Sequence, residues 1–356
     1  MPAPALDEIL PLLGENTVLG LGEPTHGSAN AFAWKLEILA ELACRRMLAA
    51  FAIEDSLVAG RLLDRALRDG GDVDEYLAAG SSIWRTATIR DGLRRLAEIA
   101  AELPPEARPR GLGIDISAPH RTARTLIELG HDVSLLRRVA VREVLGRDDV
   151  TALDALCTRL QAVHDPRTAE LARTLGRHVD AYLRAPDLLR LHRRDTHMAH
   201  TLLEQLPPRG ITVVWAHNEH IARNPDNWGG PSMGAVLAEE LDSRYVPIGM
   251  MCGKGEARAV DPSTGDDGYR AVPLPPLRPG TTDAALLARG TSFVAAAEFA
   301  HPGPRRFLGW QIDTSLVADP LAARATFEVE RPSSDFDALV ALPTSVADHS
   351  APLASR

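Results

Sequence analysis

Residues 17–27, TVLGLGEPTHG, decide how this chain is expected to fold. The first six, TVLGLG, form a short apolar run closed by glycine, which is typical of a buried β-strand. The following part, from Gly22 to Gly27, places an acid, a proline, a hydroxyl and a histidine between two glycines. Glycine has no Cβ and lets the backbone approach a ligand closely. The segment therefore predicts a buried strand that ends in a polar turn with a chemical role.

Outward from this segment, strand-like and helix-like stretches alternate. Short apolar runs predict further strands at 49–53, 111–116, 211–216 and 245–250, with weaker strand patterns at 292–296 and 326–329. Helical spacing of apolar residues predicts helices at 31–47, 57–67, 89–103 and 232–241. Such alternation favours an α/β fold with a mostly parallel central sheet flanked by helices.

The middle of the chain has a different pattern. Residues 119–206 contain long helical stretches rich in Leu, Ala and Arg and show no strand pattern. We interpret them as a helical insertion stacked on the sheet. Residues 1–118 then form the first part of the α/β core and residues 207–345 the second part. Residues 346–356 are expected to form a loose C-terminal tail.

Composition and charge argue against several classes of partner. Hydrophobic residues make up 45% and charged residues 24% of the chain, so a packed core is expected. The net charge of −9, without a dense Lys/Arg run, argues against nucleic acid. No apolar run approaches the roughly 20 residues that span a bilayer, so no membrane partner is expected. Aromatic residues, at 4%, are too sparse to predict an aromatic-lined groove.

Cysteine usage and the N-terminus predict a cytoplasmic protein. Cys44, Cys157 and Cys252 are far apart and odd in number, as expected of reduced core residues rather than a disulfide framework. The stretch Met1–Leu13 has no basic flank before its apolar residues and already carries two acids, which is unlike a signal peptide.

Acidic or histidine residues follow four of the predicted strands. Glu23 and His26 come after the first strand, Glu54 after the second, Asp115 after the third and His217 after the fourth. In a doubly wound sheet the ligand crevice lies beyond the carboxyl ends of the parallel strands. We therefore expect these five side chains to line one cleft.

Some residues at this edge also fit ordinary structural roles. Five of them are of types that cap helices, namely Thr25, Ser28, Asp55, Ser56 and Ser117. Asp115 fits a helix cap as well as a site. Glu54 ends an apolar strand, where a buried carboxylate needs a cationic partner or a function. His217 and His220 flank Asn218 in one loop, and two imidazoles so close together favour a site.

The residue types at this edge fit hydrolysis by an activated water. No cysteine in the sequence has a local histidine partner, so covalent catalysis by cysteine lacks a candidate nucleophile. A histidine held by carboxylates can instead deprotonate water, and a nearby cation can hold the oxyanion. The same residues also form a candidate Zn²⁺ or Mn²⁺ set, namely His26, His217 and His220 with Glu23 or Asp115.

The segment Gly22–Gly27, GEPTHG, resembles the GExTHG motif of the erythromycin esterase family. A second match is VWAHN at 214–218, followed by HIAR at 220–223. The resemblance also includes Lys35, Glu54, Asp115, Arg194, Asp195 and Met198. Together the matched blocks cover residues 15–60, 110–117 and 192–250.

This resemblance implies a hydrolase that cleaves an ester or lactone of a macrolide-like or other natural product. It implies a histidine-activated water, no covalent intermediate, no cofactor, and a helical insertion that forms one wall of a large cleft. By the resemblance, His26 is the general base, Glu23 and Glu54 are carboxylates around it, and His217 is the second catalytic histidine. Residues expected to bind substrate or adjust the charge of the site are Lys35, Asp115, Asn218, His220, Arg194 and Asp195.

Three other interpretations fit the same residues. They are a metal-dependent hydrolase, a biosynthetic tailoring enzyme such as a cyclase or lyase, and a non-catalytic ligand-binding protein. The sequence makes no prediction of oligomeric state. Lys35 is expected to be at least partly buried, because it neighbours Leu36 and Leu39 on the apolar stripe of its helix, and to pair with Glu23 or Glu54.

Overall fold

The computed structural model describes residues 6–352 and is built around one mixed sheet. The strands follow the order β3-β2-β4-β1-β5-β10-β7, and β6 pairs with the far end of β5. Their bounds are β1 Val18–Leu21, β2 Leu48–Ser56, β3 Arg110–Asp115, β4 Ile211–Trp215, β5 Tyr245–Val260, β6 Tyr269–Pro273, β7 Phe293–Ala295 and β10 Ala338–Ser345. A separate two-stranded sheet pairs β8 (Arg305–Arg306) with β9 (Glu328–Val329). The mostly parallel sheet predicted from the sequence is confirmed.

The register of the central strands brings their carboxyl ends level with one another. β1, β2, β3, β4, β5 and β10 run parallel, while β7 and β6 are antiparallel to their neighbours. Leu21 at the end of β1 pairs with Trp215 on one side and Ile248 on the other, and Trp215 pairs in turn with Ile53. The residues that follow these positions therefore meet at one edge of the sheet.

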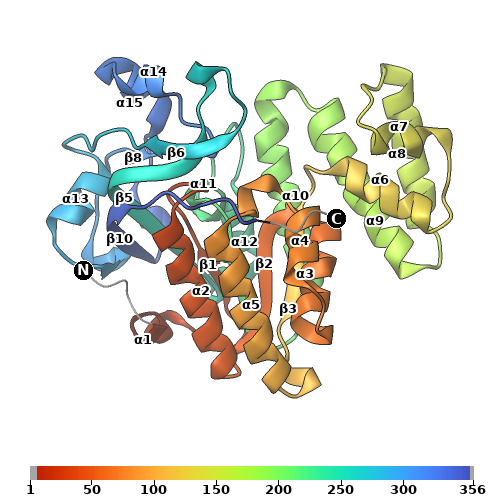
Figure 1. Cartoon of the computed structure of the whole chain (residues 1–356), viewed down its shortest axis with the longest axis horizontal. Coiled ribbons are helices and arrows are strands. Elements are labelled where there is room, and N and C mark those ends of the chain that lie inside the picture. The colour runs from red at the N-terminus through yellow and green to blue at the C-terminus, as the bar shows by residue number, and fades with distance from the viewer. Residues whose placement is uncertain (1–5, 353–356) are drawn as a thin grey trace.

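Helices cover both faces of the sheet. Figure 1 shows α2, α5 and α3 side by side over one face, with α10 and α12 on the other. Side chains alternate accordingly along β4. Val213 and Trp215 pack in the apolar core on the α2 side of the sheet, whereas Val214 packs in the apolar core on the α10 side. The helix bounds are α1 Leu6–Ile9, α2 Ala29–Cys44, α3 Leu57–Asp69, α4 Val73–Ala79, α5 Ala87–Glu102, α6 Pro119–Glu128, α7 Ser134–Ala140, α8 Arg147–Gln161, α9 Pro166–His178, α10 Arg190–Gln205, α11 Asn218–Ile221, α12 Met233–Leu241, α13 Thr282–Ala288, α14 Thr314–Val317 and α15 Pro320–Phe327.

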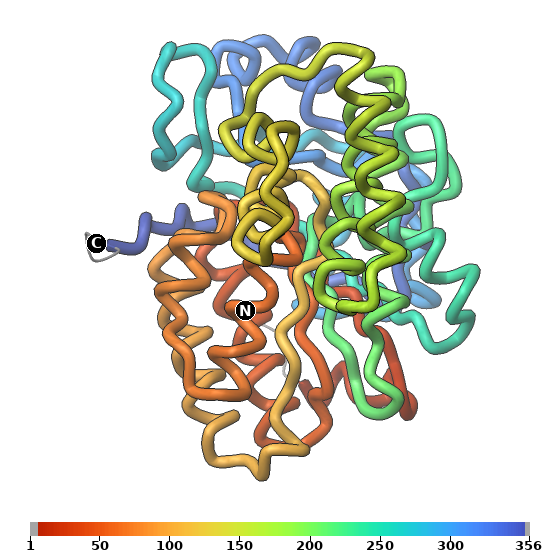
Figure 2. Tube along the Cα trace, turned by 90° about the vertical axis from the view of Figure 1, so that its right-hand side faces the viewer, coloured from red at the N-terminus to blue at the C-terminus, as the bar shows by residue number. Residues whose placement is uncertain are grey.

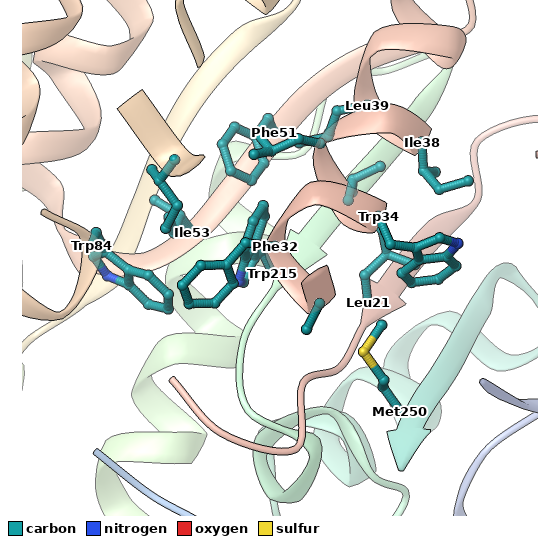
Figure 3. Close-up of a cluster of buried hydrophobic side chains, with 14 of the residues drawn as sticks. Leu21, Phe32, Trp34, Ile38, Leu39, Phe51, Ile53, Trp84, Trp215 and Met250 are labelled. Atoms are coloured by element: carbon teal, nitrogen blue, oxygen red, sulfur yellow. The ribbon is translucent and has the colours of Figure 1, made fainter. Parts of the chain in front are cut away.

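Large aromatic side chains fill the core between α2 and the sheet. Trp215 lies with its ring centroid 5.5 Å from that of Phe32, 6.0 Å from that of Phe51 and 6.2 Å from that of Trp84 (Figure 3). The Trp84 indole donates a hydrogen bond to the Glu54 carbonyl at 3.0 Å. This rigid layer lies directly beneath the residues that follow β1, β2 and β4.

Between β3 and β4 the chain forms α6 to α10 and, within residues 119–206, no strand. A π-helical turn at Val179–Arg184 continues α9. The segment has its own apolar core, which includes Leu126, Leu136, Leu153 and Leu171. Figures 1 and 2 show it, in yellow and green, as a block beside the main sheet. None of the helices within the described residues is long and apolar enough to cross a membrane.

Several expectations for the C-terminal third are wrong. β5 runs to Val260 rather than ending at 250, β6 and β10 were not predicted, and the strand expected at 326–329 is limited to β9 at Glu328–Val329, because residues 326 and 327 end α15. Glycines weaken the strand pattern of β5 in the sequence. Gly253 is nevertheless required there, because a Cβ at this position would lie 2.0 Å from the Pro343 carbonyl oxygen of neighbouring β10. Pairing with β5, rather than local pattern, defines β6 and β10.

The first part of the expected loose tail, residues 346–352, lies against two helices. Its backbone is hydrogen bonded to the first turns of α2 and α5: Ala29 N–H donates to Val346 at 2.8 Å, and Ala87 N–H donates to His349 at 2.8 Å. Unpaired N–H groups at helix starts provide these donors. The rest of the predicted tail, residues 353–356, lies outside the described residues.

Candidate functional site

A cleft of about 650 Å³ opens at the carboxyl ends of the strands, within the size range of small-molecule sites. Residues of the α/β part of the chain line the floor of the cleft. The helical segment forms one wall, and residues from 307 onward form another. Of the predicted residues, those that line the cleft are His26, Glu54, Asp115, Arg194, His217 and His220.

The turn after β1 packs against the core rather than leaving its backbone open to the cleft. Thr25 donates from its hydroxyl to the Gly309 carbonyl at 3.1 Å, so it is not a helix cap. A Cβ on Gly27 would lie 2.0 Å from the Arg258 carbonyl of β5. Close approach to β5, rather than to a ligand, therefore requires this glycine, and the turn presents His26 from a fixed backbone.

Glu23 and His26 form a pair at the floor of the cleft. The Glu23 carboxylate is fully buried, and its Oε1 lies 2.6 Å from His26 Nδ1. The expectation that Glu23 lines the cleft is wrong, because it lies behind the imidazole ring. With Nδ1 directed at Glu23, the Nε2 of His26 is on the cleft side of the ring. A buried carboxylate in this position fixes the tautomer of the ring and stabilises its protonated form.

Lys35 supports Glu23 from within the core. Its side chain is fully buried, as the helical stripe predicted, and its ammonium donates to Glu23 Oε2 at 2.8 Å and to the Leu21 carbonyl at 3.1 Å. The Trp215 indole donates to the same carboxylate oxygen at 2.7 Å. Burial lowers the pKa of Lys35 to about 8. Burial alone would raise the pKa of Glu23, but Lys35 and His26 outweigh it and hold that pKa below its usual value.

His217 lines the cleft, and the two nitrogens of its ring differ in their hydrogen bonding. Its Nδ1 accepts a hydrogen bond from the backbone N–H of Glu219 at 3.2 Å, which caps α11. Burial and the nearby His26 lower the pKa of His217 to about 4, so the ring is neutral with its proton on Nε2. That buried Nε2 has no hydrogen-bond partner within the described part of the chain. The centroids of the His26 and His217 rings are 5.3 Å apart.

Arg194 of α10 links the carboxylates that end β2 and β3. Its Nη2 donates to Glu54 at 2.7 Å and to Asp115 Oδ2 at 3.0 Å, and its Nε donates to Asp115 Oδ1 at 2.9 Å. Burial would raise the pKa of Glu54, but His220 and Arg194 hold it well below its usual value. Burial would also raise the pKa of Asp115, but the charge and hydrogen bonds of Arg194 outweigh burial and lower that pKa. Glu54 thus has the cationic partner that its burial required.

His220 is held by two carboxylates. Its Nδ1 lies 2.7 Å from Asp195 Oδ1, and its Nε2 lies 3.4 Å from Glu54 Oε1. Burial lowers the pKa of His220, but Asp195 and Glu54 outweigh this effect and raise it to about 10. Asp195 itself does not line the cleft: it lies behind His220 and accepts the Met233 N–H at 3.1 Å.

Asn218 has a structural role. Its amide donates to the Met250 carbonyl at 2.7 Å and accepts the Met250 N–H at 3.0 Å, so it ties α11 to β5 outside the cleft. Glu219, on the same turn, is held by the fully buried Arg305 at 2.8 Å and 3.1 Å. These contacts fix the loop that carries His217.

A cation from the chain already lies between the candidate metal ligands. The Arg194 guanidinium contacts Glu54 and Asp115, and its Nη1 is 3.2 Å from His220 Nε2. Within residues 6–352 no group of three or more His, Cys, Asp or Glu side chains is arranged to hold a metal ion.

Aromatic and arginine side chains in the cleft were not predicted. Two of the five tryptophans are among its aromatic residues, which are Tyr182, Trp228, Phe307, Trp310 and Phe327. Low average content therefore did not exclude an aromatic wall, and that expectation is wrong. Trp228 has φ of +53°, a conformation that is strained for so bulky a residue. Arg121 and Arg142 line the cleft from the helical segment. No local sequence pattern distinguishes these two from the many other arginines of that segment.

Fold and site together define an α/β protein with a carboxylate-held histidine at the carboxyl end of a parallel sheet. The chain belongs to the erythromycin esterase family, whose family model matches residues 48–345. That range contains Glu54, Asp115, Arg194 and His217, and it begins after the GEPTHG segment.

Solved structures share the fold at low sequence identity. A succinoglycan biosynthesis protein is 18% identical with a TM-score of 0.76, over 97% of this chain and 92% of that chain. A protein from Bacillus cereus is 19% identical with a TM-score of 0.75, over 98% and 93%. A mutant of the erythromycin esterase EreC in its open conformation is 16% identical with a TM-score of 0.64, over 99% and 95%. No curated protein matches the chain.

Proposed function

We propose that this protein hydrolyses an ester or lactone of a natural-product-like small molecule, with His26 as the general base on water. The observation that carries the proposal is the 2.6 Å contact between Glu23 Oε1 and His26 Nδ1 in a ring whose other nitrogen is on the cleft side. Membership of the erythromycin esterase family supports hydrolysis as the reaction class.

The proposed reaction begins when His26 Nε2 removes a proton from water. The resulting hydroxide attacks the carbonyl carbon, and the carbonyl oxygen becomes an oxyanion. The unpaired Nε2–H of His217 can donate to that oxygen, where a fixed donor stabilises the developing charge. Collapse of the intermediate breaks the bond to the alcohol oxygen, which receives the proton from His26. The products are an acid and an alcohol, and Glu23 stabilises the transient imidazolium.

Water is the proposed nucleophile because the cysteines do not fit that role. Burial raises the pKa of Cys157 to about 12 and that of Cys252 to about 11, so neither is a thiolate at neutral pH. Cys44 is exposed on α2 and does not line the cleft. Arg194, Glu54, Asp115 and His220 then form the fixed electrostatic wall beside the reacting group.

The test is hydrolysis of a panel of aryl esters and lactones in H₂¹⁸O, by wild-type protein washed with chelator. We expect one ¹⁸O in the acid product, also in a single turnover, since no oxygen passes through the protein. His26→Asn should lower kcat/KM by at least about 10²-fold with an unchanged melting temperature. Binding without turnover, with equal affinity in His26→Asn, would indicate a binding protein. Loss of activity on washing, restored by metal, would indicate a metal-dependent hydrolase.

A further inference from the structure

One part of the cleft carries positive charge that the chain balances only in part. Arg121 of α6 and Arg142, which follows α7, both line the cleft from the helical segment. Arg121 donates to the Gly80 carbonyl at 2.8 Å, and Arg142 lies 2.9 Å from His120 Nε2. No carboxylate within the described residues is within ion-pair distance of Arg142. The Arg142 guanidinium is therefore paired only with an imidazole.

That imidazole is neutral. Burial lowers the pKa of His120 to about 4, and the charges of Arg142, Arg121 and Arg124 act in the same direction. Burial and the neighbouring cations Arg85 and Arg142 also lower the pKa of Arg121, although Asp55 opposes them. Burial and the neighbouring cations together therefore outweigh Asp55 at Arg121.

The carboxylates that line the cleft are engaged elsewhere. Glu54 and Asp115 are bound by Arg194. Asp55 accepts the N–H of Ser56 at 2.7 Å and that of Ser81 at 2.9 Å. Its Oδ1 is 3.5 Å from the Arg121 guanidinium, and burial raises the pKa of Asp55 to about 6. An anion brought by a ligand would meet two guanidinium groups, and within the described residues Arg121 has a carboxylate, Asp55, at ion-pair distance whereas Arg142 has none.

We propose that the substrate of this hydrolase carries an anionic group, a carboxylate, sulfate or phosphate ester, that binds Arg121 and Arg142 while its scissile ester lies at His26 and His217. The inference rests on the hydrolytic function proposed above and adds the substrate class. Guanidinium groups bind such oxyanions through paired N–H donors. The same charges would repel a cationic ester, so the cleft selects against it.

A matched pair of esters tests this inference. Mono-4-nitrophenyl glutarate and 4-nitrophenyl pentanoate share the leaving group and differ by a carboxylate in place of a terminal methyl. We expect wild-type kcat/KM to be about tenfold higher for the glutarate at low salt, with the ratio decreasing as ionic strength rises. Arg142→Gln and Arg121→Gln should each lower that ratio about five- to tenfold. Arg124→Gln is the matched control: it lies on α6, is exposed and does not line the cleft, and should leave the ratio unchanged.

The outcomes separate this inference from the proposed function. If both esters are cleaved with equal kcat/KM and the arginine variants keep that ratio, the anion site is refuted while hydrolysis stands. If neither ester is cleaved, calorimetric titration of the wild type with both esters decides. Tighter binding of the glutarate that Arg142→Gln abolishes supports the anion site without hydrolysis. Equal binding, or no binding of either ester, overturns it.

Discussion

Two histidines of the cleft have the same support on one ring nitrogen and different surroundings on the other. His26 and His220 each place Nδ1 against a fully buried carboxylate, at 2.6 Å from Glu23 and 2.7 Å from Asp195. The Nε2 of His220 also faces Glu54 at 3.4 Å. Within residues 6–352 no carboxylate is at ion-pair distance from the Nε2 of His26, which is on the side of the cleft.

The difference shows that a carboxylate at Nδ1 does not by itself make a base. The pKa of His220, raised to about 10 by Asp195 and Glu54, favours the protonated ring at neutral pH, and a protonated imidazole does not take a proton from water. It acts as a fixed cation for Glu54, together with Arg194. His26 combines the same support with an accessible nitrogen, which is the requirement for deprotonating water.

The largest effect on kcat/KM is expected when the charges of Glu23 and Asp195 are removed in separate variants. Glu23→Gln should lower kcat/KM by at least about 10²-fold, because the imidazolium formed on His26 loses its counter-charge. Asp195→Asn, the matched change, should lower it less than about tenfold, since His220 does not transfer a proton. Kinetics on one ester, with circular dichroism to check folding, measure both. Equal rate losses would contradict the assignment of different roles to the two histidines.

His220 should contribute to stability in a pH-dependent way. In the unfolded chain its pKa is the ordinary 6.5, and in the folded protein it is about 10. The stabilisation is therefore complete below about pH 6.5 and is lost as the pH rises towards 10. His220→Asn should cost about 2 kcal/mol of unfolding free energy at pH 6 and clearly less at pH 9.

Urea unfolding at the two pH values measures this change. His200→Asn, at an exposed position of α10, is the control for general effects of losing a histidine. A cost for His220→Asn that is constant from pH 6 to pH 9 would mean that His220 is neutral in the folded protein.

Lys35 should act on the rate through Glu23. Lys35→Met removes the ammonium 2.8 Å from Glu23 and should lower kcat/KM about tenfold, or about 1.4 kcal/mol. Lys35→Arg keeps the charge and should retain more activity than Lys35→Met. Lys254→Met, at an exposed position, is the control. Full activity in Lys35→Met would show that Glu23 needs no cationic partner.

The same lysine should give the stability a distinct pH dependence. Its pKa is about 8 when folded and 10.5 as the ordinary value. Between these values the unfolded chain keeps a proton that the folded protein has released, so the contribution of Lys35 to the unfolding free energy rises with pH, opposite in sign to that of His220. Lys35→Met should therefore make the slope of unfolding free energy against pH more negative than in the wild type between pH 7.5 and 9.5 in urea unfolding, and Lys254→Met should keep the wild-type slope.

The core strands were predictable because their signal is local. A short apolar run that ends in Glu23 and His26, or in Glu54, predicts both a buried strand and the polar turn at its end. β10 has a comparable apolar run, but it comes after an irregular Pro- and Gly-rich stretch, and its partner β5 lies about 90 positions earlier, as in the pair Ala338 and Ile248. Local pattern carries no information about such pairing.

The site was predictable as a set of residues and not as an arrangement. The strand-end argument gathered His26, Glu54 and His217, and the structure brings them together. It could not foresee that Glu23 lies behind the ring. It also could not say which nitrogen of His220 faces Glu54, because ring orientation depends on contacts from α10, which the strand pattern does not encode.

Trp228 is expected to act on substrate binding rather than on the carboxylate–histidine pairs Glu23–His26 and Asp195–His220. Its ring centroid lies 5.4 Å from that of His220 and 6.3 Å from that of Phe307, and it lines the cleft. Trp228→Ala should raise KM about fivefold, or about 1 kcal/mol, and leave kcat within about twofold. An equal decrease in kcat would mean that the ring instead holds His220 in place.

The backbone at this position gives the experiment an internal control. At φ of +53° a Cβ is unfavourable, and glycine removes a strain of about 1 kcal/mol. Trp228→Gly and Trp228→Ala lose the same ring, so both should show the same increase in KM, while the glycine variant should be more stable by about 1 kcal/mol. If the strained tryptophan positions substrate, binding and stability must separate in this way. An alanine variant as stable as the glycine variant would show that the backbone relaxes once the ring is gone, and that the ring itself imposes the strained conformation.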